Sequence, residues 1–237
     1  MKSVVKIGIP DYLYEDLISH PDVGAEKLVP YPLWKYPPEW YTNSSKEMRD
    51  LSEFFTKGDS RRASYIQCPS VSNIIKKSIV VPAYQDYHIA CDGHRITSAV
   101  DESGNSMMTF SHSKNQHEAL TGGNYENVKI QSAMFLMSMG EEQLVLNLPP
   151  ELHESYYKSK MWTNFGMFPY KRKMSMQTNL FMPVDKEYEL TIPAGTVLNY
   201  FTFPNLKSKI HVEYVRVKDE FNPLSMLTRR VPRFILK

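Results

Sequence analysis

Three residues near the middle of the chain have the types and the spacing of a metal site. His88, Asp92 and His94 share parity, so on one uninterrupted strand their side chains would point to the same face. Two histidines and one carboxylate form the ligand set of non-haem iron enzymes. The pattern therefore raises the hypothesis of a bound metal ion, and His112 and His117 follow further along the chain.

The same segment also has a plain structural interpretation. Asp92 and Gly93 are a strong signal for a two-residue hairpin turn of type I′, in which aspartate tolerates a positive φ. A turn here would interrupt the strand and pair Cys91 with His94, so the shared parity would be lost. We therefore expect no cofactor, and iron or zinc remains the alternative.

Motifs for other kinds of catalysis are absent from the sequence. It contains no G-x-S-x-G elbow, no P-loop and no G-x-G-x-x-G fingerprint. Cys68 precedes Pro69 at an expected helix start, where a helix dipole stabilises a thiolate, but no neighbouring residue supplies a base. These features favour a protein without catalytic activity.

Residues 1–43 contain aromatic residues interleaved with prolines, and these aromatics are our first candidates for partner binding. Proline removes a backbone donor and restrains φ, so we expect an irregular arm with neither a helix nor a central strand. The arm either packs across its own sheet or wraps a neighbouring subunit. The candidate contact residues are Trp34, Tyr36 and Trp40.

Two basic clusters are further candidates for partner contact. Lys171, Arg172 and Lys173 follow Phe168 and Tyr170, and Arg229 and Arg230 precede an apolar C-terminal end. Three adjacent charges usually form a solvated loop, whereas a basic and apolar tail suits docking on another subunit. The formal net charge is only +2, so nucleic acid is not an expected partner.

Local patterns predict the elements that would position these residues. Residues 44–57 have a capping-box start and an apolar stripe typical of a helix, and a second helix is expected over residues 69–77. Nine or ten strands follow, most of them expected to pair with their neighbours in sequence. We therefore predict a mainly β domain over residues 44–237, an antiparallel β-sandwich or jelly-roll-like barrel with a short N-terminal helical elaboration.

An ordered set of motifs resembles a known family. The set comprises Arg61-Arg62, the Cys-Pro segment at residues 66–70, the helix and entry strand at residues 74–82, His112 and Gln116, and Ile192-Pro-Ala-Gly-Thr-Val-Leu198 with Phe201 and Phe203. It is similar to a family of uncharacterised proteins of tailed bacteriophages, many of them infecting marine bacteria. The resemblance implies a phage origin and a β fold with a closing hairpin at residues 192–198, and it implies no activity.

Targeting signals are not evident, which bears on compartment and role. The first ten residues lack the apolar core of a signal peptide, and no run of about 18 apolar residues is present. We expect the host cytoplasm as the compartment, with incorporation in the virion as an extension, and no membrane partner.

We expect a structural or assembly component that associates with itself or with other phage proteins. The alternatives are a metal-dependent or nucleotide-processing enzyme on a β-barrel and a phage counter-defence binding protein. A polar-lined pocket at the mouth of a sheet would favour the binding protein.

Overall fold

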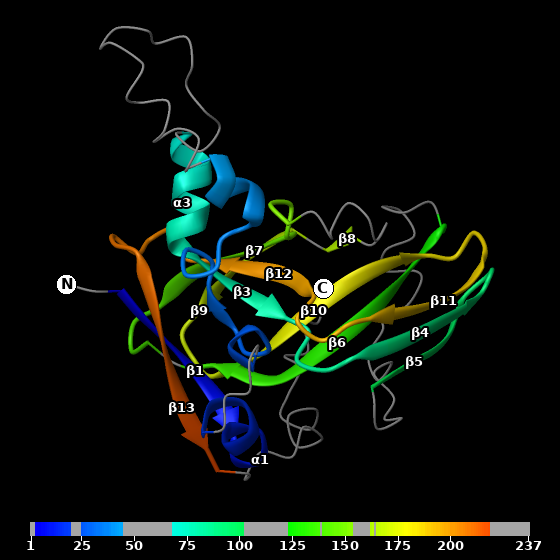
Figure 1. Cartoon of the computed structure of the whole chain (residues 1–237), viewed down its shortest axis with the longest axis horizontal. Coiled ribbons are helices and arrows are strands. Elements are labelled where there is room, and N and C mark those ends of the chain that lie inside the picture. The colour runs from blue at the N-terminus through cyan, green and yellow to red at the C-terminus, as the bar shows by residue number, and fades with distance from the viewer. Residues whose placement is uncertain are drawn as a thin grey trace, which may run out of the picture.

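The computed structural model describes residues 3–19, 25–44, 68–101, 123–137, 139–153, 162–163 and 165–218. The fold is mainly β, as expected from the sequence, with three sheets built mostly from antiparallel pairs and a few short helices. The arrangement is consistent with a β-sandwich and is not a closed barrel (Figure 1).

The first sheet, which we call sheet A, contains five strands. Their order across the sheet is β13 (Ile210–Val217), β1 (Ser3–Pro10), β6 (Tyr125–Leu136), β10 (Met174–Pro183) and β8 (Trp162–Thr163). Strand β1 runs parallel to β13 and antiparallel to β6. The expectation of an irregular N-terminal arm is therefore wrong for residues 3–10, which form an interior strand.

The sequence reason for strand β1 is a short alternation that precedes all the prolines of the arm. Val5, Ile7 and Ile9 are each fully buried, whereas Val4 is exposed and Lys6 pairs with Glu213 near the surface. This period of two is the pattern of a strand with one face in the core. The prolines that suggested irregular structure all lie at or beyond position 10, where the strand ends.

Sheets B and C form the other layer. Sheet B has the order β2 (Tyr31–Pro32), β3 (Ser78–Pro82), β12 (Val197–Thr202), β7 (Gln143–Leu148) and β9 (Gly166–Tyr170). Sheet C has the order β11 (Glu187–Ile192), β4 (Tyr87–Asp92) and β5 (Ile96–Asp101). Among the described strand pairs, only β2–β3 and β4–β5 join consecutive strands, so the expectation of mostly sequence-neighbour pairing is wrong.

The Pro193–Thr196 segment forms a corner between two sheets. Gly195 has a φ of 82°, and the Thr196 N–H donates to the Pro193 carbonyl over 3.0 Å, as in a type II turn. Strand β11 continues into sheet C and β12 into sheet B, so the two strands do not pair with each other. The expected closing hairpin is therefore wrong, although the turn itself is present.

The segment between β3 and β4 forms a second corner beside the first, and hydrogen bonds join the two corners. Strands β3 and β4 pass from sheet B to sheet C beside the first corner. The Ala83 N–H donates to the Thr196 carbonyl over 2.8 Å, and the Gly195 N–H donates to the Ala83 carbonyl over 2.7 Å. Two bent strands thus cross together, and this bend holds sheet C at one end of the sandwich (Figure 1).

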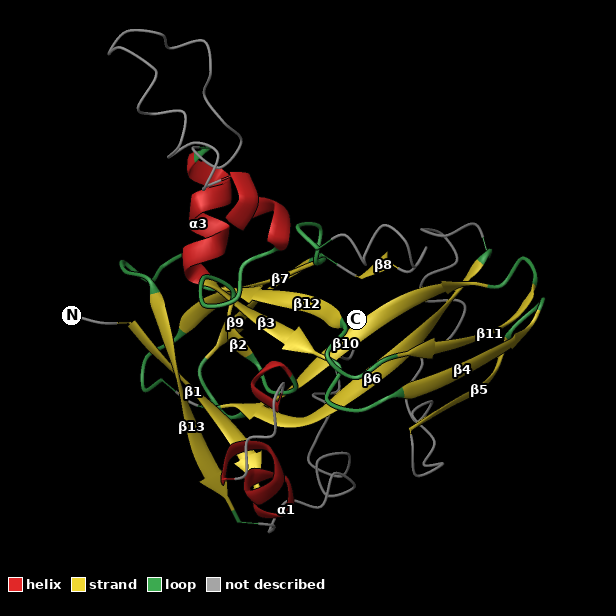
Figure 2. Cartoon of the chain, viewed as in Figure 1, coloured by secondary structure: helices red, strands yellow, loops and turns green. Residues whose placement is uncertain are grey.

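Three buried clusters fill the space between and outside these sheets. One lies between sheets A and B, and one lies between sheet C and the extension of β6 and β10. The third lies on the outer face of sheet B, where helix α3 (Pro69–Lys77) and residues 31–44 cover it (Figure 2). Sheet C therefore has one buried face and one exposed face.

Helix α3 confirms the prediction for residues 69–77, including proline at its first position. Val71 and Ile75 are buried against sheet B. Residues 39–44 are also helical, in contrast to the expected irregular arm, because Pro38 starts a turn that accepts the Tyr41 N–H at 3.0 Å. The rest of the predicted helix at 44–57 lies outside the described residues.

The remaining helical segments are short. Helix α1 (Asp11–Tyr14) continues into one π-helical turn at Glu15–Ser19, and Ala25–Lys27 form a 3₁₀ turn. Within the described ranges, no helix has the length and apolar character needed to cross a bilayer.

Candidate functional site

The metal hypothesis centres on the hairpin of strands β4 and β5. His88 and Asp92 both lie on the exposed face of β4, as their shared parity predicts. They are four residues apart on an extended strand, which separates their Cα atoms by about 13 Å. This spacing is too long for both side chains to bind one ion, and the described residues contain no group of three potential ligands.

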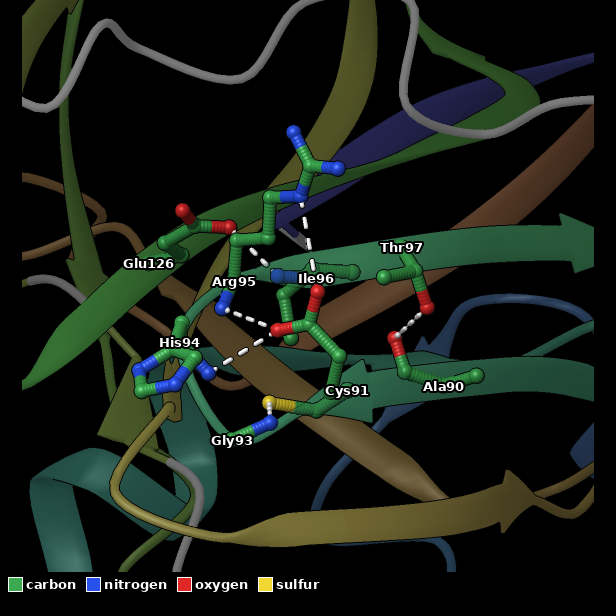
Figure 3. Close-up of polar contacts among 9 residues, drawn as sticks. Ala90, Cys91, Gly93, His94, Arg95, Ile96, Thr97 and Glu126 are labelled. Atoms are coloured by element: carbon green, nitrogen blue, oxygen red, sulfur yellow. Dashed lines mark hydrogen bonds and ion pairs between the residues drawn. The ribbon is translucent and has the colours of Figure 1, made fainter.

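Asp92 instead organises the turn. Its Oδ1 accepts the backbone N–H groups of His94 and Arg95, both at 2.9 Å, and its Oδ2 lies 3.5 Å from the Arg95 Nε (Figure 3). The backbone bonds to His94 and Arg95 lower the pKa of Asp92, and the charge of Arg95 adds to this. The imidazole of His94 points away from this carboxylate (Figure 3).

The turn is shifted by one residue from the Asp92-Gly93 pair expected from the sequence. The backbone bond that closes it runs from the Asp92 N–H to the Arg95 carbonyl over 3.2 Å, so Gly93 and His94 lie between the bonded residues, and Gly93 has a φ of 87°. Cys91 pairs with Ile96 after a register shift, so the expected pairing of Cys91 with His94 is wrong. The side chain of Asp92 favours this turn because its carboxylate accepts the backbone N–H groups of His94 and Arg95.

A hollow on the exposed face of sheet C is a second candidate site. Its volume is about 540 Å³. All three strands contribute to it, because His88 pairs with Thr191 on β11 while Ala90 pairs with both Ser98 on β5 and Glu189 on β11. The lining residues are His88, Ile89, Ala90, Ser98, Glu189, Leu190 and Thr191.

The hollow exists because Ala90, a small residue, lies on the outward face of the central strand β4 between His88 and Asp92. Across the sheet, Ala90 lies between Ser98 on β5 and Glu189 on β11. At one end, the His88 Nδ1 lies 3.0 Å from the Thr191 Oγ1. Sequence reasoning identified His88 but missed Glu189 and Thr191, because β11 is about a hundred residues from β4 and no local signal indicates that they pair.

The aromatic candidates of the N-terminal segment pack on their own chain. Trp34 donates from Nε1 to the Ile210 carbonyl over 2.5 Å, and Trp40 donates from Nε1 to the Leu152 carbonyl over 2.7 Å. The ring of Tyr36 packs edge-on against Tyr31 at 5.4 Å. Residues 31–44 therefore follow the first of the two interpretations, in which the segment packs across its own sheet.

The basic cluster lies in the loop between β9 and β10. Lys171 and Arg172 are exposed, whereas the Lys173 Nζ lies 4.3 Å from the centre of the Phe135 ring. Partial burial lowers the pKa of Lys173. The two other basic candidates, Arg229 and Arg230, lie outside the described residues.

An apolar surface beside this loop was not predicted. Phe165 and Met167 have exposed fractions of 70% and 63%, among the few large exposed apolar residues of the described chain. Met167 pairs with Leu146, and Pro169 pairs with Leu144, which are both half-buried. We call these five residues the β9 patch. Residues 165–170 are Phe-Gly-Met-Phe-Pro-Tyr and show no alternation of apolar and polar residues, so no local signal indicated which of these side chains would be exposed.

A buried histidine was also missed by the sequence reasoning. His153 lies beneath the helical layer of sheet B, where its Nδ1 hydrogen bonds with the hydroxyl of the fully buried Tyr200. Removal from solvent lowers the pKa of His153 from 6.5 to about 4. The neutral ring is therefore part of the packing between Tyr200 and the segment that holds Trp40.

The two cysteines are unpaired. Cys68 precedes helix α3, and hydrogen bonds from the backbone of Val71 and Ser70 lower the pKa of its thiol. Cys91 is buried in the cluster under sheet C, where its Sγ accepts the Gly93 N–H at 3.4 Å. Both arrangements fit the expected role of small packing residues.

Comparison with known proteins gave no match to a protein-family model, to a curated protein or to a solved structure.

Proposed function

We propose that this chain is a phage protein without catalytic activity that acts as a structural or assembly component by associating with itself. The observation that carries the proposal is the β9 patch. Apolar side chains exposed as strongly as those of Phe165 and Met167, and adjacent to one another, are typical of surfaces that are covered by a partner. The resemblance of the motifs at residues 61–203 to tailed-phage proteins supports the phage origin.

The position of the patch suits contact between copies. Strand β9 is the outermost described strand of sheet B, so one edge of its backbone faces outward, and its exposed side chains are those of Met167 and Pro169. Pro169 has no N–H and interrupts a backbone ladder, as is common at edges that must not extend the sheet without limit. We therefore propose that side-chain packing around Met167, rather than a continuous sheet, makes the contact.

The self-association is tested by light scattering of the purified full-length chain. We expect a dimer or a larger symmetric assembly, and we expect Met167→Lys to shift it towards the monomer, because a charge would be buried in the contact. The matched control is Val4→Lys, which introduces the same side chain at an exposed strand position with an exposed fraction of 39%. A monomeric wild type, or equal effects of the two variants, would contradict the proposal.

Incorporation in the virion is tested separately. We expect mass spectrometry of purified phage particles to detect the protein at many copies per particle. Its absence from particles that infect normally would restrict the proposal to an assembly role inside the host cell.

The hollow on sheet C favours a second candidate function, a binding protein with a small-molecule ligand. Polar side chains from three strands converge on it. Convergent polar groups around a concave surface are the usual form of a ligand site. A counter-defence protein of the phage that sequesters a small host molecule would use such a site.

A further inference from the structure

The hollow on sheet C has a polar wall and an apolar floor. Ala90 forms the floor, and Ser98 and Glu189 flank it from the two neighbouring strands. The Thr191 hydroxyl and the His88 ring close one end, 3.0 Å apart between Oγ1 and Nδ1. Three oxygen-bearing side chains thus surround one alanine methyl group.

The charge of this surface is negative. Glu189 is the only permanently charged residue among those that line the hollow, and no lysine or arginine lines it. Glu187 lies two residues along the same face of β11, opposite Asp92. The charge of Asp92 is already matched by Arg95, whereas no salt bridge is found for Glu189 within the described residues.

This chemistry selects against several ligand classes. An anion would be repelled by Glu189 and would find no cation in the hollow. A sugar would normally stack on an aromatic ring, and the only ring in the lining belongs to His88, whose Nδ1 contacts Thr191. A metal ion would need further ligands near Glu189, and the described residues contain no such group.

We propose that the hollow binds a small aliphatic primary amine. An ammonium group has three N–H donors. The carboxylate of Glu189 accepts one of them, and the hydroxyl of Thr191, two residues along the same face of β11, accepts another, while Ser98 borders the hollow on the opposite strand. In the His88 tautomer with its proton on Nε2, the Thr191 hydroxyl donates to Nδ1 and its oxygen accepts from the ligand. The alkyl chain of the amine lies over Ala90. This inference gives a ligand class to the second candidate function and does not depend on self-association.

The test is a titration of the isotope-labelled full-length protein, followed by nuclear magnetic resonance. The probe is butane-1,4-diamine as its chloride salt, and the matched neutral probe is butane-1,4-diol at the same ionic strength. We expect the diamine to shift the amide signals of Ala90, Ser98 and Glu189, and the diol to leave them unchanged. Glu189→Gln keeps the shape of the side chain and should weaken diamine binding by about tenfold, equivalent to about 1.4 kcal/mol.

Two further variants separate a specific site from general surface charge. Glu213→Gln removes the same charge from an exposed position on β13 and should leave diamine affinity unchanged. Ala90→Leu fills the hollow and should abolish binding, and the amide spectrum shows whether this variant is folded. Equal shifts with the diol, shifts outside sheet C, or an unaltered affinity of Glu189→Gln would each overturn the proposal. A lysine-containing peptide that binds more tightly than the free diamine would also overturn it, in favour of a protein partner.

Discussion

The burial of His153 constrains the protonation state of its imidazole ring. Its ring hydrogen bonds to Tyr200, and the adjacent Leu152 carbonyl accepts a bond from Trp40. An imidazole in this position is stable only when it is neutral, because protonation would bury a charge beside Tyr200 without a counter-ion. The titration of His153 is therefore linked to the attachment of the helical layer to sheet B.

The linkage predicts a specific dependence of stability on pH. The folded-state pKa of His153, about 4, lies below the unfolded value of 6.5, so between these values only the unfolded chain binds the proton. The free energy of unfolding should therefore fall as pH falls through this window, by about 2 kcal/mol between pH 7 and pH 5. Urea unfolding at a series of pH values measures this slope.

His153→Gln provides the control for this prediction. Glutamine keeps a polar group beside the Tyr200 hydroxyl and does not titrate. The variant should therefore lose most of the slope between pH 5 and pH 7 while remaining folded at pH 7. An equally steep slope in the variant would assign the pH dependence to other groups.

At the scale of elements, a buried pair of polar side chains, Thr178 and Asn199, joins the two layers of the sandwich. Thr178 on β10 donates from Oγ1 to the Asn199 Oδ1 on β12 over 2.8 Å, and the Asn199 side-chain amide bonds to Asn147 on β7. Thr178 and Asn199 have exposed fractions of 1% and 0%. Such a pair is favourable only when it is complete, because a buried acceptor without a donor loses its solvation.

Thr178→Val should therefore destabilise the protein by about 1–3 kcal/mol, because it removes the donor and leaves the buried Asn199 oxygen with one partner fewer. The midpoint of chemical unfolding should fall without a change in slope. Thr97→Val is the matched control, because the Thr97 hydroxyl donates to the Ala90 carbonyl at an exposed position over 3.2 Å. It should change stability by no more than about 0.5 kcal/mol. Equal effects of the two substitutions would rule out the buried pair as the cause.

At the scale of the whole molecule, strand β1 joins two segments that are distant in sequence, β13 and β6, in sheet A. It lies between β13 and β6, and its register joins Ser3 to Ile210 and Ile7 to Leu136. Deleting residues 1–43 would consequently remove an interior strand as well as the aromatic segment. Such a deletion cannot report on partner contact, and point substitutions in the β9 patch are the appropriate test.

The packing around β1 predicts that a larger residue at Gly8 destabilises the protein. A Cβ atom at this residue would lie 2.6 Å from the Met137 Sδ and 2.8 Å from the Val217 Cγ2, so Gly8→Ala must displace both neighbours. We expect a loss of about 1–3 kcal/mol in the free energy of unfolding. Gly166→Ala is the control, because nothing lies within 4 Å of its Cβ position, and it should be neutral or slightly stabilising. A neutral Gly8→Ala would contradict this prediction and show that the Met137 and Val217 side chains move aside at little cost.

Local features were predictable from the sequence because their causes are local. Proline at the first position and apolar residues three and four apart predicted helix α3 with its observed bounds. Turns were expected at Asp92-Gly93 and within residues 192–198, and Gly93 and Gly195 lie in turns there with a positive φ. The mainly β character followed from the number of expected strands.

The tertiary structure alone decided which strands meet, and with them the candidate sites. The hollow requires β11 to pair with β4, and the fold requires β13 to pair with β1 from the opposite end of the chain. Strand pairing depends on how side chains of distant segments pack together, and the sequence around each strand does not encode its partner. The metal hypothesis rested on the shared parity of residues along one strand. The folded hairpin shows instead that His88 and Asp92 are too far apart to bind one ion and that the Asp92 carboxylate caps the turn.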